Sequence, residues 1–238
     1  MNLLLDAIRW VFDPANYGGP NGIETRSGEH LALSGLVLLI AVVIAVPFGY
    51  FIGHTGHGRA LIVPLSGGVR ALPTLGLLIL VALNVGIGVV APIVALVVLA
   101  IPSILAGAYS GFEAIDRRVI DAARAVGMTE WQILIRVEIP LGLPLLIGGL
   151  RSASLQVIAT ATLADYVSGG GLGHFLFLGL QTNNYPEMLG GSIVVIVLAL
   201  ASEGLFGLLQ RLVVPAGVAA RQPKDVRLRP VRSQTALG

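Results

Sequence analysis

Long apolar runs constrain this chain more than any other feature. The run from Leu31 to Ile52 is an almost unbroken series of Leu, Val, Ile and Ala. A helix of about 20 such residues, rising about 1.5 Å per residue, crosses the hydrocarbon core of a bilayer. Charged residues make up only 12% of the 238 positions, against about 25% in soluble domains. The sequence therefore excludes an ordinary soluble enzyme and predicts an all-α integral membrane protein.

Five stretches are long enough to cross a membrane, and they predict the domain organisation. Residues 1–30 are expected to lie outside the membrane, with a short interfacial helix over residues 6–12 that presents Trp10, and the polar residues 214–238 to form a disordered cytoplasmic tail. The second stretch contains Gly67, Gly68, Arg70 and Pro73, so it predicts either one helix or two short helices separated at Pro73. Within the membrane domain of residues 31–213, the expected spans are about 31–52, 60–87, 89–112, 141–164 and 188–212.

The positions of Arg and Lys predict the orientation of these helices. If the polar residues 113–140 lie in the cytoplasm, residues 54–59 and the C-terminal tail lie there too, and the opposite side receives only Arg9 and Arg26. An excess of basic residues in cytoplasmic loops is the rule in membrane proteins. We therefore expect the N-terminus outside and the C-terminus inside. The cytoplasmic set is Arg59, Arg117, Arg118, Arg124, Arg136, Arg211, Arg221, Lys224, Arg227, Arg229 and Arg232.

Two composition features exclude whole classes of chemistry. The chain has no cysteine, which excludes disulfides and thiolate metal sites. Its single lysine, Lys224, does not stand in a phosphate-binding G-x-x-x-x-G-K-[ST] loop. His54 and His57 have no Asp, Glu or Cys near them in sequence, so no metal site is expected there. We predict a subunit without an ATPase site or bound cofactor. If the protein does ATP-driven work, ATP and magnesium bind to a different chain.

Residues 113–140 are too polar for a span but carry a helical pattern. Asp116 is a suitable cap for a first helix that ends at Gly127, and Thr129 for a second that ends at Pro140. Both helices have an apolar face although they lie outside the membrane. That face packs either against the ends of the chain's own helices or against a partner subunit.

The same segment resembles the EAA loop of ABC importer permeases. Asp121, Ala122 and Ala123 are followed after three residues by Gly127 and, nine residues later, by Val-Glu-Ile-Pro ending at Pro140. The family signature is Glu-Ala-Ala, three residues, Gly, nine residues, Ile-x-Leu-Pro. In that family the loop is the coupling helix, which sits in a groove of the ATPase subunit. The resemblance implies a type I ABC importer permease bundle, with ATPase coupling through Asp121, Ala122, Ala123, Gly127, Met128, Trp131 and Pro140.

Further segments resemble the osmoprotectant branch, whose members import glycine betaine, carnitine, choline or proline. They include Arg70-Ala-Leu-Pro-Thr-Leu75, Gly149-Leu-Arg151 and Gly169-Gly-Gly-Leu-Gly173. Ala106-Gly107 departs from the polar pair expected before the path residue Tyr109. The resemblance implies a bacterial plasma membrane location, an ABC ATPase, an exterior substrate-binding protein and a second permease subunit, identical or paralogous. An ABC permease for another small solute, such as an amino acid, is the alternative; no nucleic-acid partner is expected.

Three ionisable residues fall at similar depth near the middle of the bilayer. These are Arg70, Arg151 and Glu203. Because charges at that depth normally pair or face a cavity, we predict that Glu203 pairs with Arg151, or else with Arg70. The pair is either a structural lock of the bundle or a gate that contacts a zwitterionic solute.

The polar candidates for a translocation path lie on several predicted spans. Ser152, Gln156 and Thr160 are spaced four apart and share one helix face; this stripe either lines the path or bonds to another helix. Asn84 is a weaker candidate of the same kind. The glycine run is interpreted as a turn that lets Leu172 and Phe175 fold back on the bundle. By resemblance, Gly170 and Leu172 belong to an outer gate.

The predicted spans contain few aromatic residues for binding a quaternary ammonium group. Tyr50, Phe51 and Phe112 stand at span ends and are interpreted as interface anchors, so specificity is expected to reside in the binding protein. Two other classes of membrane protein, a secondary transporter and an enzyme, would have features that this sequence does not show. An ion-coupled secondary transporter would carry internal repeats and several intramembrane acids, and a membrane enzyme would carry a histidine–carboxylate cluster, whereas no histidine stands clearly inside a predicted span.

Overall fold

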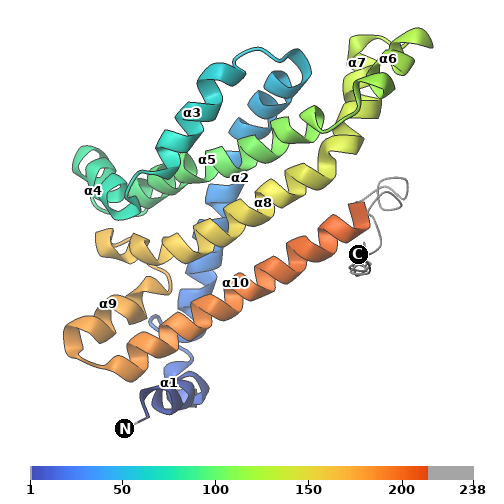
Figure 1. Ribbon diagram of the computed structural model, residues 1–238. Coiled ribbons are helices and arrows are strands. Elements are labelled where there is room, and N and C mark those ends of the chain that lie inside the picture. The colour runs from blue at the N-terminus through green and yellow to red at the C-terminus, as the bar shows by residue number, and fades with distance from the viewer. Residues whose placement is uncertain (1, 214–238) are drawn as a thin grey trace, which may run out of the picture.

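The computed structural model describes residues 2–213, and this part of the chain consists of helices and their connections. The predicted tail of residues 214–238 lies outside the described residues. Figure 1 shows the order of the elements along the chain. The helices are α1 (Leu3–Phe12), α2 (Ile23–Thr55), α3 (Arg59–Arg70), α4 (Thr74–Val85), α5 (Val90–Glu113), α6 (Arg117–Ala125), α7 (Glu130–Ile133), α8 (Ile139–Thr160), α9 (Gly173–Thr182) and α10 (Tyr185–Val213), with short turns η1 (Pro14–Asn16), η2 (Leu134–Glu138) and η3 (Ala161–Val167).

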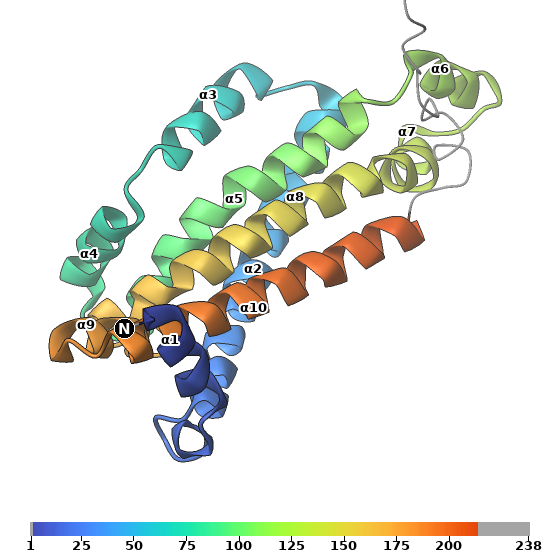
Figure 2. The ribbon, with the colours of Figure 1, turned by 60° about the horizontal axis from the view of Figure 1, so that its bottom comes forward.

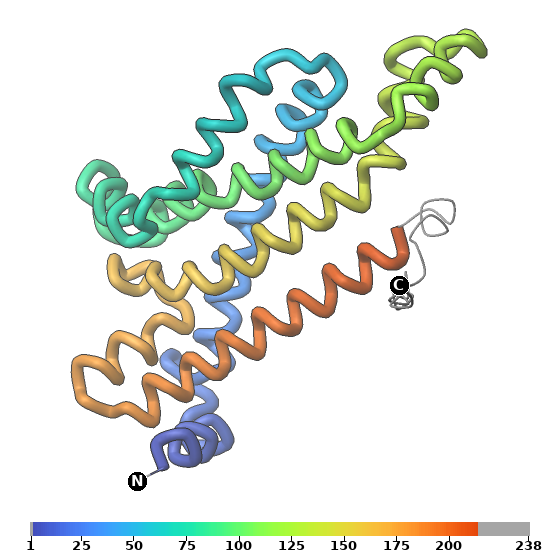
Figure 3. The backbone as a smooth tube through the Cα atoms, in the orientation of Figure 1, coloured from blue at the N-terminus to red at the C-terminus, as the bar shows by residue number. Residues whose placement is uncertain are grey.

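Four continuous helical segments are long and apolar enough to cross a membrane, or up to five if a bent pair counts as one span. The four are α2, α5, the segment that contains α8, and α10. In Figure 2, α10, α8 and α5 run side by side, α3 and α4 follow on the far side of α5, and α2 crosses behind α5 and α8. The tube in Figure 3 shows the same order from the first direction. The prediction of an all-helical membrane protein with about five spans is confirmed.

The second predicted span is two short helices. α3 ends at Arg70 and α4 begins at Thr74, and their axes differ by 93°. Pro73 precedes α4 with an extended backbone. A proline has no backbone N–H to donate and disfavours helical geometry in the residue before it. Of the two arrangements that the sequence allowed, the structure has the one broken at Pro73.

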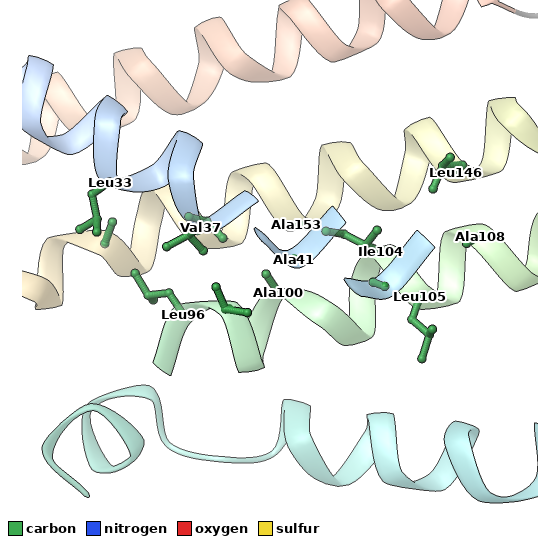
Figure 4. Packing of buried hydrophobic residues seen from close by; sticks show 14 of the residues in the cluster. Leu33, Val37, Ala41, Leu96, Ala100, Ile104, Leu105, Ala108, Leu146 and Ala153 are labelled. Carbon is green, nitrogen blue, oxygen red and sulfur yellow. The ribbon is translucent and has the colours of Figure 1, made fainter. Parts of the chain in front are cut away.

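The centre of the bundle is packed with small side chains where α2, α5 and α8 meet. Figure 4 shows Val37 and Ala41 of α2 against Ala100 and Ile104 of α5, with Ala153 of α8 beside them. Small residues let helix backbones approach closely, which favours association in a membrane. The helices therefore contact one another through small side chains and closely spaced backbones, with few large apolar side chains between them.

Two pairs of glycines mark the crossing of α5 and α8. A methyl group added at Gly107 would lie 2.8 Å from the carbonyl oxygen of Leu145 and 2.9 Å from the α-carbon of Gly149. One added at Gly111 would lie 2.6 Å from the carbonyl oxygen of Gly142. Gly107 thus occupies a helix crossing, which explains why a small residue stands where a path-lining polar residue was expected.

The N-terminal segment differs from its prediction. α2 begins at Ile23, so residues 23–30 continue the first long helix. α1 packs against α10, and Trp10 meets Phe175 edge to face with ring centres 5.1 Å apart. The Trp10 ring is therefore packed against the α9–α10 hairpin and is not presented freely. The interfacial location of α1 stays a prediction.

Candidate functional site

The 113–140 loop begins with a helix whose ends match the sequence prediction. The Asp116 carboxylate accepts a hydrogen bond from the Arg118 backbone N–H at 3.0 Å and caps α6. Gly127, just beyond α6, has φ +82°, a left-handed conformation that favours glycine at a helix end. Thr129 and Gln132 form a capping box at the start of α7, which satisfies free backbone N–H groups. Both predicted caps are confirmed.

The apolar residues of this loop divide into an inner and an outer set. Ile120, Ala123 and Ile133 are buried together, so part of the apolar surface is covered by the loop itself. Val126 and Trp131 are 78% and 69% exposed, and Val119 and Ile135 are also exposed. A soluble loop rarely exposes a cluster of large apolar side chains without a partner. The inner set thus packs within the loop itself, neither on the ends of the membrane helices nor on a partner. Packing of the outer set against a partner subunit stays a prediction.

Pro140 does not end the second helix, contrary to the sequence prediction. α7 continues through η2, a π-helical turn, directly into α8. The Ile139 N–H donates to the carbonyl of Leu134, five residues earlier. A wider turn at this point gives room for the proline ring and for its missing hydrogen bond, so the chain passes Pro140 without a break.

His54, at the C-terminal end of α2, lies against two carboxylates of this loop. Its Nδ1 atom is 2.5 Å from Glu138 Oε2, and its Nε2 atom is 3.9 Å from Glu130 Oε2. No acid stands near this histidine in the sequence; the fold brings both carboxylates from more than 70 positions away. Among the described residues, no group of three or more potential metal ligands is present. His54 is a residue that sequence reasoning missed.

Glu130 connects this contact to α6. Its carboxylate accepts two hydrogen bonds from the Arg124 guanidinium, at 2.8 and 3.1 Å. The side-chain hydrogen bond with Glu130 raises the pKa of Arg124, so the guanidinium stays charged. Planar two-point pairing of this kind fixes the relative direction of both side chains.

The predicted intramembrane pair of Arg151 and Glu203 is present. The Arg151 guanidinium donates to Glu203 between α8 and α10. Ser154 and Ser202 form a hydrogen bond beside it at 2.6 Å. Arg70 lies elsewhere and donates to the Pro102 carbonyl at 3.2 Å. The pair joins two helices, as a structural lock would; its role as a gate stays a prediction.

The predicted path residues do not form one cluster. Gln156 faces α5, where it donates to the Leu99 carbonyl at 3.3 Å and meets Ser103 at 3.4 Å. The Thr160 hydroxyl donates to the Gln156 carbonyl of its own helix at 2.7 Å. The rest are spread along the bundle: Ser152 is exposed, Asn84 is exposed and bonds within α4, and Tyr109 packs at the edge of the central core.

The glycine run lies at the opposite end of the bundle and folds back as predicted. Leu172 and Phe175 are buried with Ile158. The Gly171 N–H donates to Glu29, and the Leu172 N–H to His30 Nδ1. Gly170 has φ +75°, and a methyl group there would lie 2.9 Å from the Glu29 carboxylate. The run is therefore a tight turn held by the N-terminal end of α2.

Two expectations about single residues are corrected. His30 lies inside α2 with its side chain fully buried, and its Nε2 atom is 2.9 Å from the Ile158 carbonyl oxygen. Phe112 is buried and stacks on Tyr50 with ring centres 4.8 Å apart, because the two helix ends converge there. Of the three predicted interface anchors, only Phe51 is largely exposed.

The sequence is similar to those of known transport proteins. The family described as "Binding-protein-dependent transport system inner membrane component" matches residues 45–216. The glycine betaine/carnitine/choline transport system permease protein OpuCB of Bacillus subtilis (strain 168) is 31% identical over 193 residues, covering 81% of this chain and 89% of that protein. The carnitine transport permease protein OpuCB of Listeria monocytogenes is 32% identical over 214 residues, covering 90% and 96%.

Solved structures give the same assignment. A chain of the MetNI methionine ABC transporter in an inward facing conformation has a TM-score of 0.70 and 25% identity, covering 81% of this chain and 96% of that chain. The helical arrangement is that of the type I ABC importer permeases. Because the family match extends over most of the chain, the protein belongs to the family of binding-protein-dependent transport system inner membrane components.

Proposed function

We propose that this chain is the permease subunit of an ATP-driven importer of quaternary ammonium solutes such as glycine betaine, choline or carnitine. The relatives named for these solutes cover most of the chain and of their own length. Proline, which carries no quaternary ammonium group, is the remaining compatible solute among the predicted substrates. The chain would form half of the translocation path, and a separate binding protein would select the solute.

The proposal that this chain couples to an ATPase rests on the outer apolar set of the 113–140 loop. Trp131 and Val126 are largely exposed while the loop's inner apolar residues are already packed. A large aromatic residue at the centre of an interface commonly supplies much of its binding energy. This surface would dock on an ABC ATPase, which binds ATP and magnesium, with Asp121, Ala122 and Gly127 nearby.

Copurification with the ATPase tests this docking. Trp131→Ala should weaken retention of the ATPase subunit at least about tenfold, because an interface anchor is removed. Phe12→Ala is the matched control, since Phe12 is 76% exposed on α1, far from the loop. Equal retention by both variants would contradict docking through this surface.

We infer the N-outside, C-inside orientation from the basic residues, and labelling can test it. The chain has no cysteine, so single cysteines introduced at Phe12 and Val126 provide unique sites for a membrane-impermeant reagent. In intact cells the cysteine at position 12 should react and that at position 126 should not. The reverse pattern would place the loop outside and remove the basis for ATPase docking.

We also propose a second permease subunit in the membrane. α10 exposes the side chains of Ile196, Val197, Leu200, Leu205 and Leu208. Within residues 2–213, only 6% of its most apolar stretch is buried. Four or five spans are too few to enclose a path. Lipid and a second subunit, identical or paralogous, would share these outer faces.

An amino-acid solute is the second candidate, favoured by the structural likeness to a methionine transporter. The two candidates are separated by isolating the binding protein that copurifies with the complex. Titration with glycine betaine, choline, carnitine, proline and methionine should give micromolar binding of a quaternary ammonium solute. Binding of methionine alone would favour the second candidate.

A further inference from the structure

The 113–140 loop projects beyond the ends of α5 and α8, as Figures 1 and 3 show. Within residues 2–213, side chains of residues 114–138 form hydrogen bonds or ion pairs outside this segment only with His54. The remaining side-chain bonds of the segment are internal, such as those between Arg124 and Glu130. Glu113, where the loop leaves α5, pairs with Arg59 of α3 at 2.6 Å. Beyond Glu113, His54 of α2 is the one side chain among residues 2–213 that joins the loop to the neighbouring helices through polar contacts.

The stronger half of this attachment is the bond between His54 and Glu138. Nδ1 and Oε2 are 2.5 Å apart, and the Glu138 side chain is only 8% exposed. A buried carboxylate is costly unless it is paired, so Glu138 depends on the imidazole. The π-helical turn η2 ends at Glu138; such turns change which side a residue faces and are frequent at functional sites.

The weaker half extends the attachment to α6. His54 Nε2 is 3.9 Å from Glu130, which holds Arg124 through two hydrogen bonds. The Nη1 atom of Arg124 lies 3.7 Å from Oδ1 of Asp121, the first residue of the Asp-Ala-Ala sequence. A continuous series of side-chain contacts thus joins the end of α2 to the helix that carries the family signature.

The other end of α2 holds the glycine turn on the opposite side of the bundle. Glu29 and His30 accept hydrogen bonds from the backbone of Gly171 and Leu172. α2 is a single helix from these contacts to His54. A movement of the glycine turn relative to the bundle can therefore reach the 113–140 loop along one rigid element.

We propose that His54 is a positioning residue for energy coupling: its contacts with Glu138 and Glu130 set the angle between α2 and the 113–140 loop. The inference rests on the proposed function, because only a loop that docks on an ATPase has a coupling step to position. His54 touches neither solute nor nucleotide, and it acts through the two carboxylates.

The test uses the complete transporter, with its ATPase and binding protein, in proteoliposomes. The quantity measured is solute imported per ATP hydrolysed. His54→Ala should lower this ratio about tenfold, the effect expected when a hydrogen bond to a charged group is lost, while the ATPase still copurifies. His57→Ala is the matched control: His57 is exposed and, within residues 2–213, bonds only to Thr55, so its ratio should equal that of the wild type.

Conservative variants separate positioning from general stability. His54→Asn places an amide N–H near the position of Nδ1 and should recover most of the ratio. His54→Ala leaves the Glu138 charge buried and unpaired, which can destabilise the protein by itself. The double variant His54→Ala/Glu138→Gln removes that charge, so its melting temperature should return toward the wild-type value while the ratio stays low.

Each contrary result has a distinct meaning. An unchanged ratio in His54→Ala, or a ratio that recovers together with the melting temperature in the double variant, would overturn the positioning role. A wild-type complex without a copurifying ATPase or ATP-dependent uptake would instead contradict the proposed function, before any variant is compared.

Discussion

The two ends of α2 are each held by a histidine, but the partners differ in kind. His30 is fully buried and meets two backbone groups, the Ile158 carbonyl and the Leu172 N–H. An uncharged ring with its proton on Nε2 satisfies both contacts. His54 is partly exposed and meets two side-chain carboxylates. Backbone partners cannot move without the helix or turn that carries them, whereas side-chain partners can. The N-terminal end is thus a rigid joint, and the C-terminal end is an adjustable one.

The comparison predicts that the largest loss of stability comes from the buried histidine. His30→Ala should lower the free energy of unfolding by about 2–4 kcal/mol, because it leaves a cavity and an unsatisfied backbone N–H. Chemical or thermal unfolding of the purified protein in detergent measures the change. A shift no larger than that of His57→Ala would show that the joint at His30 is not rigid.

A second change tests the helix between the two ends. A methyl group at Gly49 would lie 2.4 Å from the Ala108 side chain, so Gly49→Val should cost about 1–3 kcal/mol through overpacking between α2 and α5. Gly35→Ala is the control in the same helix, because no described atom outside the adjoining backbone of α2 lies within 4 Å of an added methyl group. It should leave stability unchanged or raise it by up to about 1 kcal/mol. Equal effects at both positions would contradict close packing of α2 on α5.

The smallest effect on stability is expected for the exposed ion pair near the adjustable end. Arg124→Ala removes an exposed ion pair with Glu130, and exposed pairs contribute little to folding. The melting temperature should not change measurably. Solute imported per ATP should fall by less than about fivefold, and by less than in His54→Ala, because the bond to Glu138 remains. A melting temperature lowered as much as in His30→Ala would erase the distinction between the two ends.

Several features of the fold and site were predictable because they depend on local rules or on large energetic costs. Asp116, Thr129 and Gly127 mark helix ends through short-range hydrogen bonds and backbone geometry. The pairing of Arg151 with Glu203 was predictable because isolated charges in a membrane are costly. The break at Pro73 was one of two possibilities, since proline interrupts a helix but tertiary contacts decide how sharply.

The wrong predictions share another physical cause. Pro140 was expected to stop a helix, but a π-helical turn accommodates it. Trp10 was expected to be presented by a short interfacial helix and Phe112 to anchor a span end, yet each packs on an aromatic ring from a distant segment. His54 was judged by its sequence neighbours, whereas its partners come from residues 130 and 138. Each of these outcomes depends on how helices cross, and the crossing is not a local property.

The sequence by itself determined that the chain is helical and membrane-embedded, where several helices are capped, and which charges had to be paired. These follow from the cost of burying polar groups in hydrocarbon and from backbone geometry within a few residues. Only the tertiary structure decided that α2 links the glycine turn to the 113–140 loop through His30 and His54. That link requires residues far apart in sequence to meet, and the meeting is set by the glycine and alanine contacts that bring α2, α5 and α8 together.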